Sequence, residues 1–176
     1  MLKLADKNDF DNVFAIMCES FPKDEYRTRD EQKELFERDE YRVYLDLSST
    51  DGTIRGFAAV WVLDNVCFLE HLAVDARFRN QGIGAKIIGE LLELFDRRVC
   101  LEVELPEKAL AKRRIGFYER CGFTLNGYSY LQPAMSAGQN AVPLLVMTSW
   151  GALEPTAFSA LRDLLYDRVY GVSSCN

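Results

Sequence analysis

The chain has 176 residues, of which 48% are hydrophobic and 27% are charged, and its formal net charge is −6 at pH 7. This length favours one folded domain, and the composition excludes a disordered, collagen-like or coiled-coil chain. The excess of acidic side chains disfavours nucleic acid and anionic membranes as partners, because binding to phosphate needs positive charge. No apolar stretch reaches the ~18 residues of a membrane-spanning helix.

The cysteines and the first residues indicate a reducing compartment. Five cysteines are present without metal-ligand spacing, and the single histidine, His71, excludes a zinc site with several histidine ligands. The first ten residues lack the apolar core of a secretory signal. We therefore expect reduced thiols, a cytoplasmic setting and no bound metal.

Apolar spacing divides the chain into alternating strands and helices. A strand is expected at 2–5 and an amphipathic helix from about residue 9 to 21, followed by a charged segment, 23–42, that should form a solvated helix and loop. Strands are then expected at 41–47, 54–63, 66–74, 99–105, 123–131 and 142–149, and helices at 83–95, 107–121 and 155–170. This order predicts a mixed α/β (α+β) fold in a single domain over residues 1–176, with the last helix packed on or beside it.

A glycine-containing loop between an expected strand and helix is the first functional signal. It runs from Arg79 to Gly84, and its two glycines let the backbone approach a ligand closely. The unpaired amides of the following helical turn form a site suited to phosphate. The loop lacks the third glycine of a dinucleotide fingerprint, where Ile87 stands, and the lysine of a P-loop, where Ala85 stands. For the glycines alone, a tight turn without a ligand is the simpler interpretation.

The residues around this loop resemble the acetyl-CoA-binding motif of the GNAT superfamily of N-acetyltransferases. An apolar strand ends in Leu72–Val74, and the loop Arg79–Gly84 follows with the R-x-x-G-x-G spacing. A second element, Phe117–Phe123, is similar to the FYxxxGF motif of the family. The resemblance spans roughly residues 2–131 and implies a mostly antiparallel central sheet flanked by helices, to which this chain adds a C-terminal helix.

The resemblance implies acetyl-CoA as the acetyl donor. Amides of the glycine loop would hold the CoA pyrophosphate, and the strand end would pair with the pantetheine arm as a sheet edge pairs with an added strand. An amide near Leu72 would donate to the thioester carbonyl as negative charge develops on it. The expected cofactor-binding residues are Leu72, Ala73, Val74, Arg79, Asn80, Gln81, Gly82, Ile83 and Gly84.

One position departs from the family pattern. Many members carry an asparagine about seven residues before the tyrosine of the FY element, and this chain has Ala111 there. The basic run 112–114 follows, which either reaches the CoA phosphates or solvates the helix, and solvation is the simpler interpretation. The departure affects one expected cofactor hydrogen bond and leaves the other motifs intact.

Glu70 is the candidate general base. The resemblance implies direct attack by a primary amine, and an amine with a pKa near ~10 has to lose a proton before it attacks. Strand alternation predicts that Glu70 shares a face with Phe68 and Leu72, where apolar neighbours would raise its pKa. The structural alternative is that Glu70 pairs with an arginine. His71 is expected on the opposite face, partly buried.

Tyr118 is the candidate general acid. The departing CoA thiolate has the pKa of a free thiol, about 8.5, and a neutral tyrosine hydroxyl can protonate it. Adjacent helical residues point about 100° apart, so one of Phe117 and Tyr118 can face the core while the other faces the cleft. The family match assigns the cleft to Tyr118, and a buried aromatic anchor is the alternative.

These residues predict an N-acetyltransferase that moves an acetyl group from acetyl-CoA to a primary amine. The alternative from another class is a non-catalytic acyl-CoA-binding or regulatory module of the same fold. The acceptor is expected to be a small-molecule or peptide amine, and segments 21–26 and 128–132 are candidates for lining its site. Neither a nucleic acid nor a membrane partner is expected, and a homodimer is left open.

Overall fold

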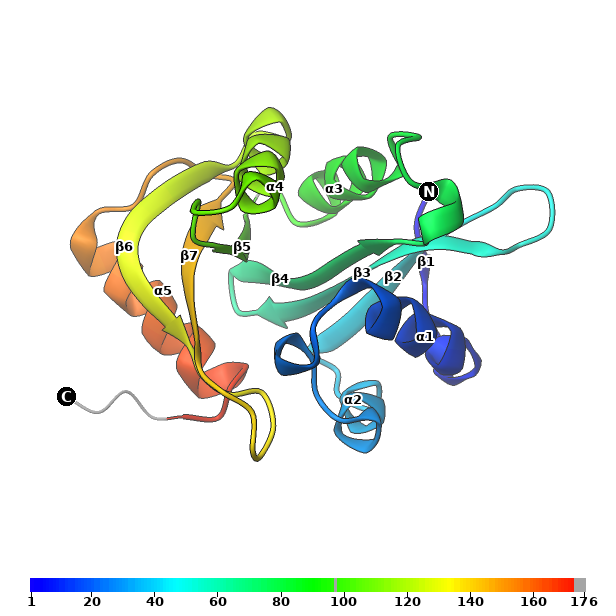
Figure 1. The fold of residues 1–176 in the computed structure, drawn as a ribbon, viewed down its shortest axis with the longest axis horizontal. Helices are drawn as coiled ribbons and strands as arrows, with labels where there is room; N and C mark the ends of the chain where they lie inside the picture. The colour runs from blue at the N-terminus through cyan, green and yellow to red at the C-terminus, as the bar shows by residue number, and fades with distance from the viewer. Residues whose placement is uncertain (97, 173–176) are drawn as a thin grey trace.

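The computed structural model of the protein describes residues 1–96 and 98–172, so Cys175 lies outside the described residues. Within them, seven strands form one sheet in the order β1-β2-β3-β4-β5-β7-β6 (Figure 1). The strands are β1 (Lys3–Leu4), β2 (Tyr41–Leu47), β3 (Ile54–Leu63), β4 (Val66–Val74), β5 (Val99–Glu104), β6 (Thr124–Gln132) and β7 (Val142–Thr148). The helices are α1 (Phe10–Ser20), α2 (Arg29–Leu35), α3 (Ile83–Leu94), α4 (Ala109–Arg120) and α5 (Pro155–Arg168).

The sheet is mixed and mostly antiparallel, as expected. Strand β4 runs parallel to β5, and the other neighbouring strands pair antiparallel. In Figure 1, strands β2, β3 and β4 run at a steep angle to strands β5, β6 and β7. The sheet therefore has two halves that meet between β4 and β5.

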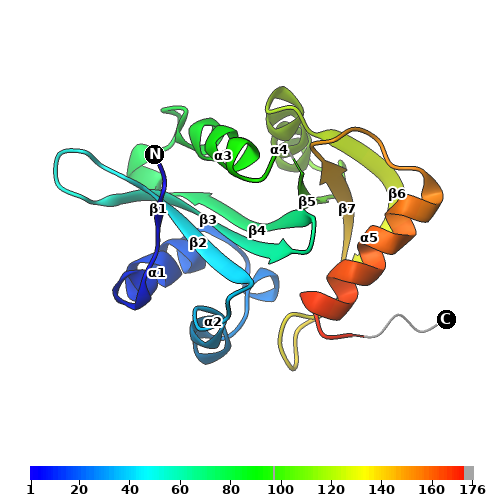
Figure 2. The same ribbon diagram turned by 180° about the vertical axis from the view of Figure 1, so that it is seen from behind.

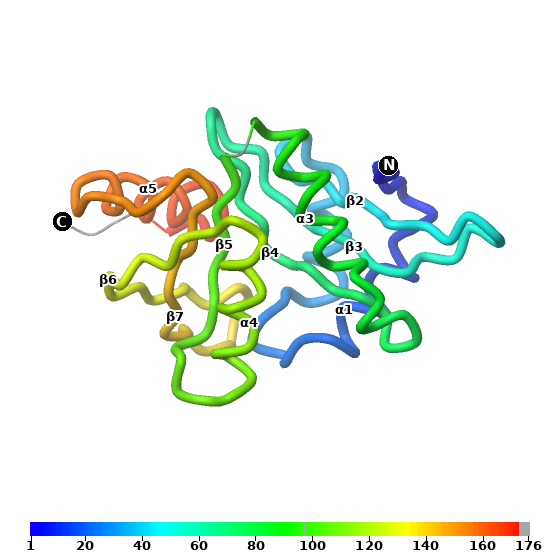
Figure 3. The backbone as a smooth tube through the Cα atoms, turned by 90° about the horizontal axis from the view of Figure 1, so that it is seen from above, coloured from blue at the N-terminus to red at the C-terminus, as the bar shows by residue number. Residues whose placement is uncertain are grey.

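Helices cover both faces of the sheet and enclose two apolar cores. On one face, α1, α2 and α5 pack over a core that includes Phe57 and Trp61, and Figure 2 shows α5 lying across β6 and β7. On the other face, α3 and α4 pack over a core that includes Ile87 and Leu91, and Figure 3 shows α3 over β3 and β4. The C-terminal helix is thus an integral part of the first core.

A β-bulge interrupts β4 at Glu70. Strand β3 pairs Ala59 with His71 and Val60 with Leu69, so Glu70 is an extra residue without a partner of its own in β3. The extra residue reverses the alternation of side chains along the rest of the strand. Phe68 therefore belongs to the core under α5, and Leu72 packs against the core under α3. The expectation that even-numbered residues of β4 share one face is wrong for this reason.

Pairing between β4 and β5 ends immediately before the bulge, at Leu69 and Leu101. Beyond this point β4 continues to pair with β3 alone. The amide of Asp75 donates to the Arg55 carbonyl oxygen at 2.9 Å, which fixes the order of hydrogen-bonded pairs in this ladder. Since these pairs alternate, the backbone groups of Leu72 and Val74 point away from β3, toward the side where β5 has diverged.

The four described cysteines are free thiols, and Cys67 and Cys100 are buried. Burial raises the pKa of the Cys67 thiol, which keeps it protonated as a small apolar side chain in the core. None of the helices in the described part of the chain has the length and apolarity needed to cross a membrane.

Candidate functional site

A cavity of about 660 Å³ lies at the divergence of β4 from β5, bordered by the glycine loop, α3 and α4. It collects nearly all of the residues that the sequence assigns to the cofactor. Gln81 is exposed and is absent from the lining. The expected residues that line the cavity are Leu72, Ala73, Val74, Arg79, Asn80, Gly82, Ile83, Gly84 and Tyr118.

The glycine loop leaves backbone exposed to this cavity. Gly82 precedes α3 with a φ of +76°, a left-handed conformation that side chains disfavour. A Cβ atom on Gly84 would lie 3.4 Å from Phe117 Cζ and 3.8 Å from Val74 Cγ2, so glycine keeps the space between these side chains free. The amides of the first turn of α3 have no partner within the helix and can bind an anion. Arg79 holds the start of the loop to β4, because its Nε donates to the Val74 carbonyl oxygen at 3.0 Å.

Tyr118 and Phe117 both border the cavity, although only one of them was expected to. The Tyr118 side chain is buried between Phe117 and Phe123, whose ring centres lie 5.1 and 5.8 Å from its own. Burial raises the pKa of Tyr118 to about 12, so the hydroxyl stays protonated at neutral pH. Among the described residues it has no hydrogen-bond partner, which leaves it free to donate to a molecule in the cavity.

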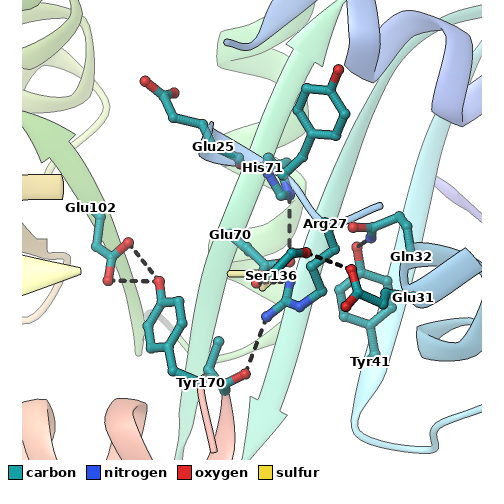
Figure 4. Close-up of polar contacts among 12 residues, drawn as sticks. Glu25, Arg27, Glu31, Gln32, Tyr41, Glu70, His71, Glu102, Ser136 and Tyr170 are labelled. Carbon is teal, nitrogen blue, oxygen red and sulfur yellow. Dashed lines mark hydrogen bonds and ion pairs between the residues drawn. The ribbon is translucent and has the colours of Figure 1, made fainter. Parts of the chain in front are cut away.

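Glu70 forms a buried ion pair with Arg27, whose Nη1 lies 2.7 Å from Glu70 Oε1 (Figure 4). The two side chains are only 2% and 8% exposed. Burial alone would raise the pKa of Glu70, but Arg27 and then His71 outweigh it and lower the pKa to about 2. The expected increase in the pKa of Glu70 is therefore wrong, and the alternative that it pairs with an arginine is confirmed.

His71 lies beside Glu70 and not on the opposite face of the sheet as expected. Its Nδ1 is 3.4 Å from Glu70 Oε2, and its Nε2 donates to the Glu25 carbonyl oxygen at 2.7 Å. The bulge explains the error, because it brings the side chains of two consecutive residues to the same side of the strand. The ring of His71 also packs on Phe21, with the ring centres 4.8 Å apart.

Arg27 comes from the charged segment that was expected to be solvated. Its Nη2 donates to the Val169 carbonyl oxygen at 3.1 Å, and its guanidinium lies 5.7 Å from the centre of the Trp61 ring. The side chain thus joins the bulge of β4 to the end of α5. Sequence periodicity could not reveal this, because an arginine in a charged run gives no signal of burial.

A second, smaller cavity of about 50 Å³ adjoins the first. Phe21 and Arg114 line both, and Arg114 Nη1 lies 3.0 Å from Glu104 Oε2. Arg114 is therefore more than a solvating residue of α4. The remaining lining of the second cavity is rich in carboxylates, and includes Glu25, Glu70, Glu102 and Glu104 together with His71, Gln132 and Tyr170.

Glu102 is a second residue of the site that the sequence did not reveal. It follows Leu101, the last residue of β5 paired with β4, and so lies across the divergence from Glu70. The hydroxyls of Tyr130 and Tyr170 donate to its carboxylate. Burial raises the pKa of Glu102 to about 7, against the opposing effect of the two tyrosines and with a further contribution from Glu70. Only the parallel pairing of β4 with β5 brings these two glutamates together, and a sequence does not specify that register.

Comparisons with known proteins identify the family of the chain. A family model described as the acetyltransferase (GNAT) family matches residues 10–123. A protein from Bacteroides thetaiotaomicron that is assigned to the GNAT family has a solved structure with a TM-score of 0.88 and 31% identity, over 98% of this chain and 99% of that one. The chain therefore belongs to the GNAT family of acetyltransferases. A search of curated proteins gives no match.

Two more distant structures share the fold. The ribosomal-protein-S18-alanine N-acetyltransferase from Escherichia coli is 18% identical, with a TM-score of 0.63 over 84% of this chain and 90% of that one. A variant of the spermidine N-acetyltransferase from Vibrio cholerae is 12% identical, with a TM-score of 0.61 over 85% of this chain and 93% of that one.

The Arg27–Glu70 pair generates a prediction on stability. Arg27→Met or Glu70→Leu alone should lower the free energy of unfolding at pH 7 by about 3–5 kcal/mol, because each leaves one buried charge unpaired. Urea unfolding of the two variants measures this loss. The pKa of Glu70 is lowered from 4.5 to about 2, so the contribution of the pair is complete above pH 4.5 and is lost as the pH falls toward 2.

The double variant Arg27→Met with Glu70→Leu is the matched control. It removes both charges and should recover most of the lost stability, since apolar replacements of a buried pair are often neutral or stabilising. Single variants as stable as the wild type would contradict the burial of this pair.

Proposed function

We propose that the protein transfers an acetyl group from acetyl-CoA to a primary amine by direct attack of the amine on the thioester. The observation that carries this proposal is the meeting of two cavities where β4 diverges from β5. The larger cavity has exposed backbone and a free tyrosine hydroxyl, and the smaller one has carboxylates. Membership of the acetyltransferase (GNAT) family supports the transfer of an acetyl group.

The donor side is built from backbone groups. Leu72 and Val74 present theirs toward the divergence, where an extended pantetheine arm can pair with them as an added strand. In this arrangement the Leu72 amide donates to the thioester oxygen and stabilises the charge that develops there. The amides at the start of α3 bind the pyrophosphate.

We assign the role of general base to Glu102. A base works best when its pKa is close to the working pH, and the value of about 7 for Glu102 meets this condition. Glu70 was the candidate from the sequence, and its catalytic role stays a prediction. A carboxylate with a pKa of about 2 holds a proton weakly, so Glu70 is better suited to fix Arg27.

We assign the role of general acid to Tyr118. A hydroxyl with a pKa of about 12 is protonated at neutral pH, and it can donate its proton to the CoA sulfur as the bond between the acyl carbon and the sulfur breaks. The Tyr118 side chain is buried and lines the larger cavity. This position supports proton donation to the departing sulfur, which stops the thiolate from attacking the product.

The acceptor is proposed to be a small-molecule or peptide amine that binds in its ammonium form. Arg27 and Arg114 neutralise Glu70 and Glu104, and the carboxylates of Glu25 and Glu102 remain to attract a cation. The small volume admits an unbranched alkylammonium group. A panel of primary amines assayed with acetyl-CoA for thiol release tests this function. Acetyl-CoA binding without turnover on any amine would favour a non-catalytic acyl-CoA-binding module.

A larger side chain at Gly84 should block the part of the cavity beside the glycine loop. Gly84→Val places a branched side chain between Phe117 and Val74, and should weaken acetyl-CoA binding by about tenfold or more, or at least 1.4 kcal/mol. Isothermal titration calorimetry measures the affinity. Gly89→Val is the control, because Gly89 is exposed on the same helix with nothing within 4 Å of its added Cβ. Equal affinities for the two variants would remove the loop from the donor site.

The pH–rate profiles of variants at Glu102 and Glu70 distinguish which of the two carboxylates is the base. With Glu102 as the base, activity should rise as the pH passes about 7, where its carboxyl loses the proton. Glu102→Gln should lower kcat by about 10²–10⁴-fold and abolish this rise, which is the acidic limb of the pH–rate profile. Glu70→Gln should keep the limb, though with lower stability. All variants are assayed on the same amine, so its own ionisation is common to them. A limb lost in Glu70→Gln and kept in Glu102→Gln would return the role of base to Glu70.

The Tyr118 hydroxyl predicts a loss of rate without a loss of binding. Tyr118→Phe keeps the buried ring, so stability and acetyl-CoA affinity should stay near those of the wild type. Turnover should fall by about 10²-fold, because the thiolate leaves without a proton. Steady-state kinetics on a confirmed acceptor measure the change. Wild-type turnover would reduce Tyr118 to a packing residue.

A further inference from the structure

The C-terminal helix delivers two polar groups to the active site. The carbonyl oxygen of Val169, at the end of α5, accepts from Arg27, and the hydroxyl of Tyr170 lies 2.8 Å and 3.0 Å from the two carboxylate oxygens of Glu102. Figure 4 shows Tyr170 reaching up from the end of α5 to Glu102. The helix therefore contacts both charged elements of the site within two consecutive residues.

Several elements face the Glu102 carboxylate. Tyr130 from β6 donates to Oε1, and Glu70 from β4 and Arg27 act through their charges. Charged or titratable neighbours that line the same cavity are Glu25, His71, Glu104 and Arg114. Among the described residues, two groups come from the C-terminal helix region: Tyr170, whose hydroxyl bonds the carboxylate, and Tyr166 of α5, which acts on Glu102 through its charge and packs on Tyr130.

The geometry of Tyr170 suits a positioning role. The Tyr170 hydroxyl lies within hydrogen-bond distance of both carboxylate oxygens, and Tyr130 donates to one of them, so hydroxyls from two different elements together restrain the orientation of the carboxylate. A phenol also favours the ionised carboxylate over the protonated form. Tyr170 thus acts on the orientation of Glu102 and on its charge.

We propose that Tyr170 is a positioning residue for Glu102, and that the C-terminal helix is for this reason a working part of the active site. The proposal rests on the proposed function, in which Glu102 is the base. A merely structural Tyr170 would anchor α5 to the sheet, and its loss would change stability without changing how Glu102 titrates.

The experiment compares Tyr170→Phe with the matched control Tyr166→Phe. Tyr166 lies on α5 and donates its hydroxyl to the Leu131 carbonyl oxygen, so the control also removes a hydroxyl near the C-terminus. Carbon-13 NMR of glutamate-labelled protein follows the Glu102 carboxyl, whose signal is identified by its absence in Glu102→Gln. This titration needs no catalytic activity, and steady-state kinetics over the same pH range accompany it.

Tyr170→Phe should raise the pKa of Glu102 by about 0.5–1 unit, because a hydrogen bond to the ionised form is lost. The rising limb of kcat should move to higher pH by the same amount, and KM for acetyl-CoA should stay unchanged. Tyr166→Phe should show clearly smaller shifts, because the Tyr166 hydroxyl donates to the Leu131 carbonyl oxygen and makes no hydrogen bond to Glu102 among the described residues. Tyr130→Phe should raise the pKa as well, and this positive control shows that the carboxyl signal responds to the loss of one hydroxyl.

The outcomes separate the two claims. An inactive Glu102→Gln together with an unshifted titration and profile in Tyr170→Phe would overturn the role of Tyr170 and leave the proposed base intact. Wild-type activity in Glu102→Gln would overturn the proposed base, and any catalytic role of Tyr170 with it.

Discussion

A buried ion pair at an irregularity of the central strand organises this protein. Arg27 holds Glu70 at the bulge of β4, and the same guanidinium binds the backbone at the end of α5. A buried charge without a partner costs free energy, because it has lost its contact with water. The elements that carry the two charges must therefore stay close enough for the pair to form. The segment between α1 and α2, strand β4 and the end of α5 therefore all contact the Arg27 side chain.

The bulge explains why the site lies where it does. Beyond Glu70, β4 no longer pairs with β5, and backbone groups that a continuous sheet would use point into a cavity. The carboxylate across the divergence belongs to Glu102. Burial raises its pKa and the hydrogen bonds from Tyr130 and Tyr170 lower it, and the resulting pKa is about 7. A single extra residue in one strand thus accompanies both an open strand edge and an acidic pocket beside it, which are the donor and acceptor sides of the proposed function.

Local sequence signals predicted most of the fold and named most of the residues that the structure brings together around the larger cavity. The strands 41–47, 54–63 and 66–74 begin and end where apolar runs and turn residues place them, and the glycine loop and Tyr118 border one cavity. The errors arise from one local irregularity and from contacts between distant segments. Alternation assumes a regular pleat, so it misplaced His71 and gave Glu70 apolar neighbours. Glu102 and Arg27 remained unseen, because only strand pairing and a distant connection bring them to the site.

The central claim is that the strand edge beyond the bulge receives the donor, and amide hydrogen exchange tests it most directly. The amides of Leu72 and Val74 point away from β3 and should exchange rapidly in the free protein, whereas that of Ala73 is bonded within the ladder. Saturating acetyl-CoA should slow exchange at Leu72 and Val74 and leave Ala73 nearly unchanged. Acetyl-CoA that binds by calorimetry but leaves the exchange of Leu72 and Val74 unaltered would contradict this account.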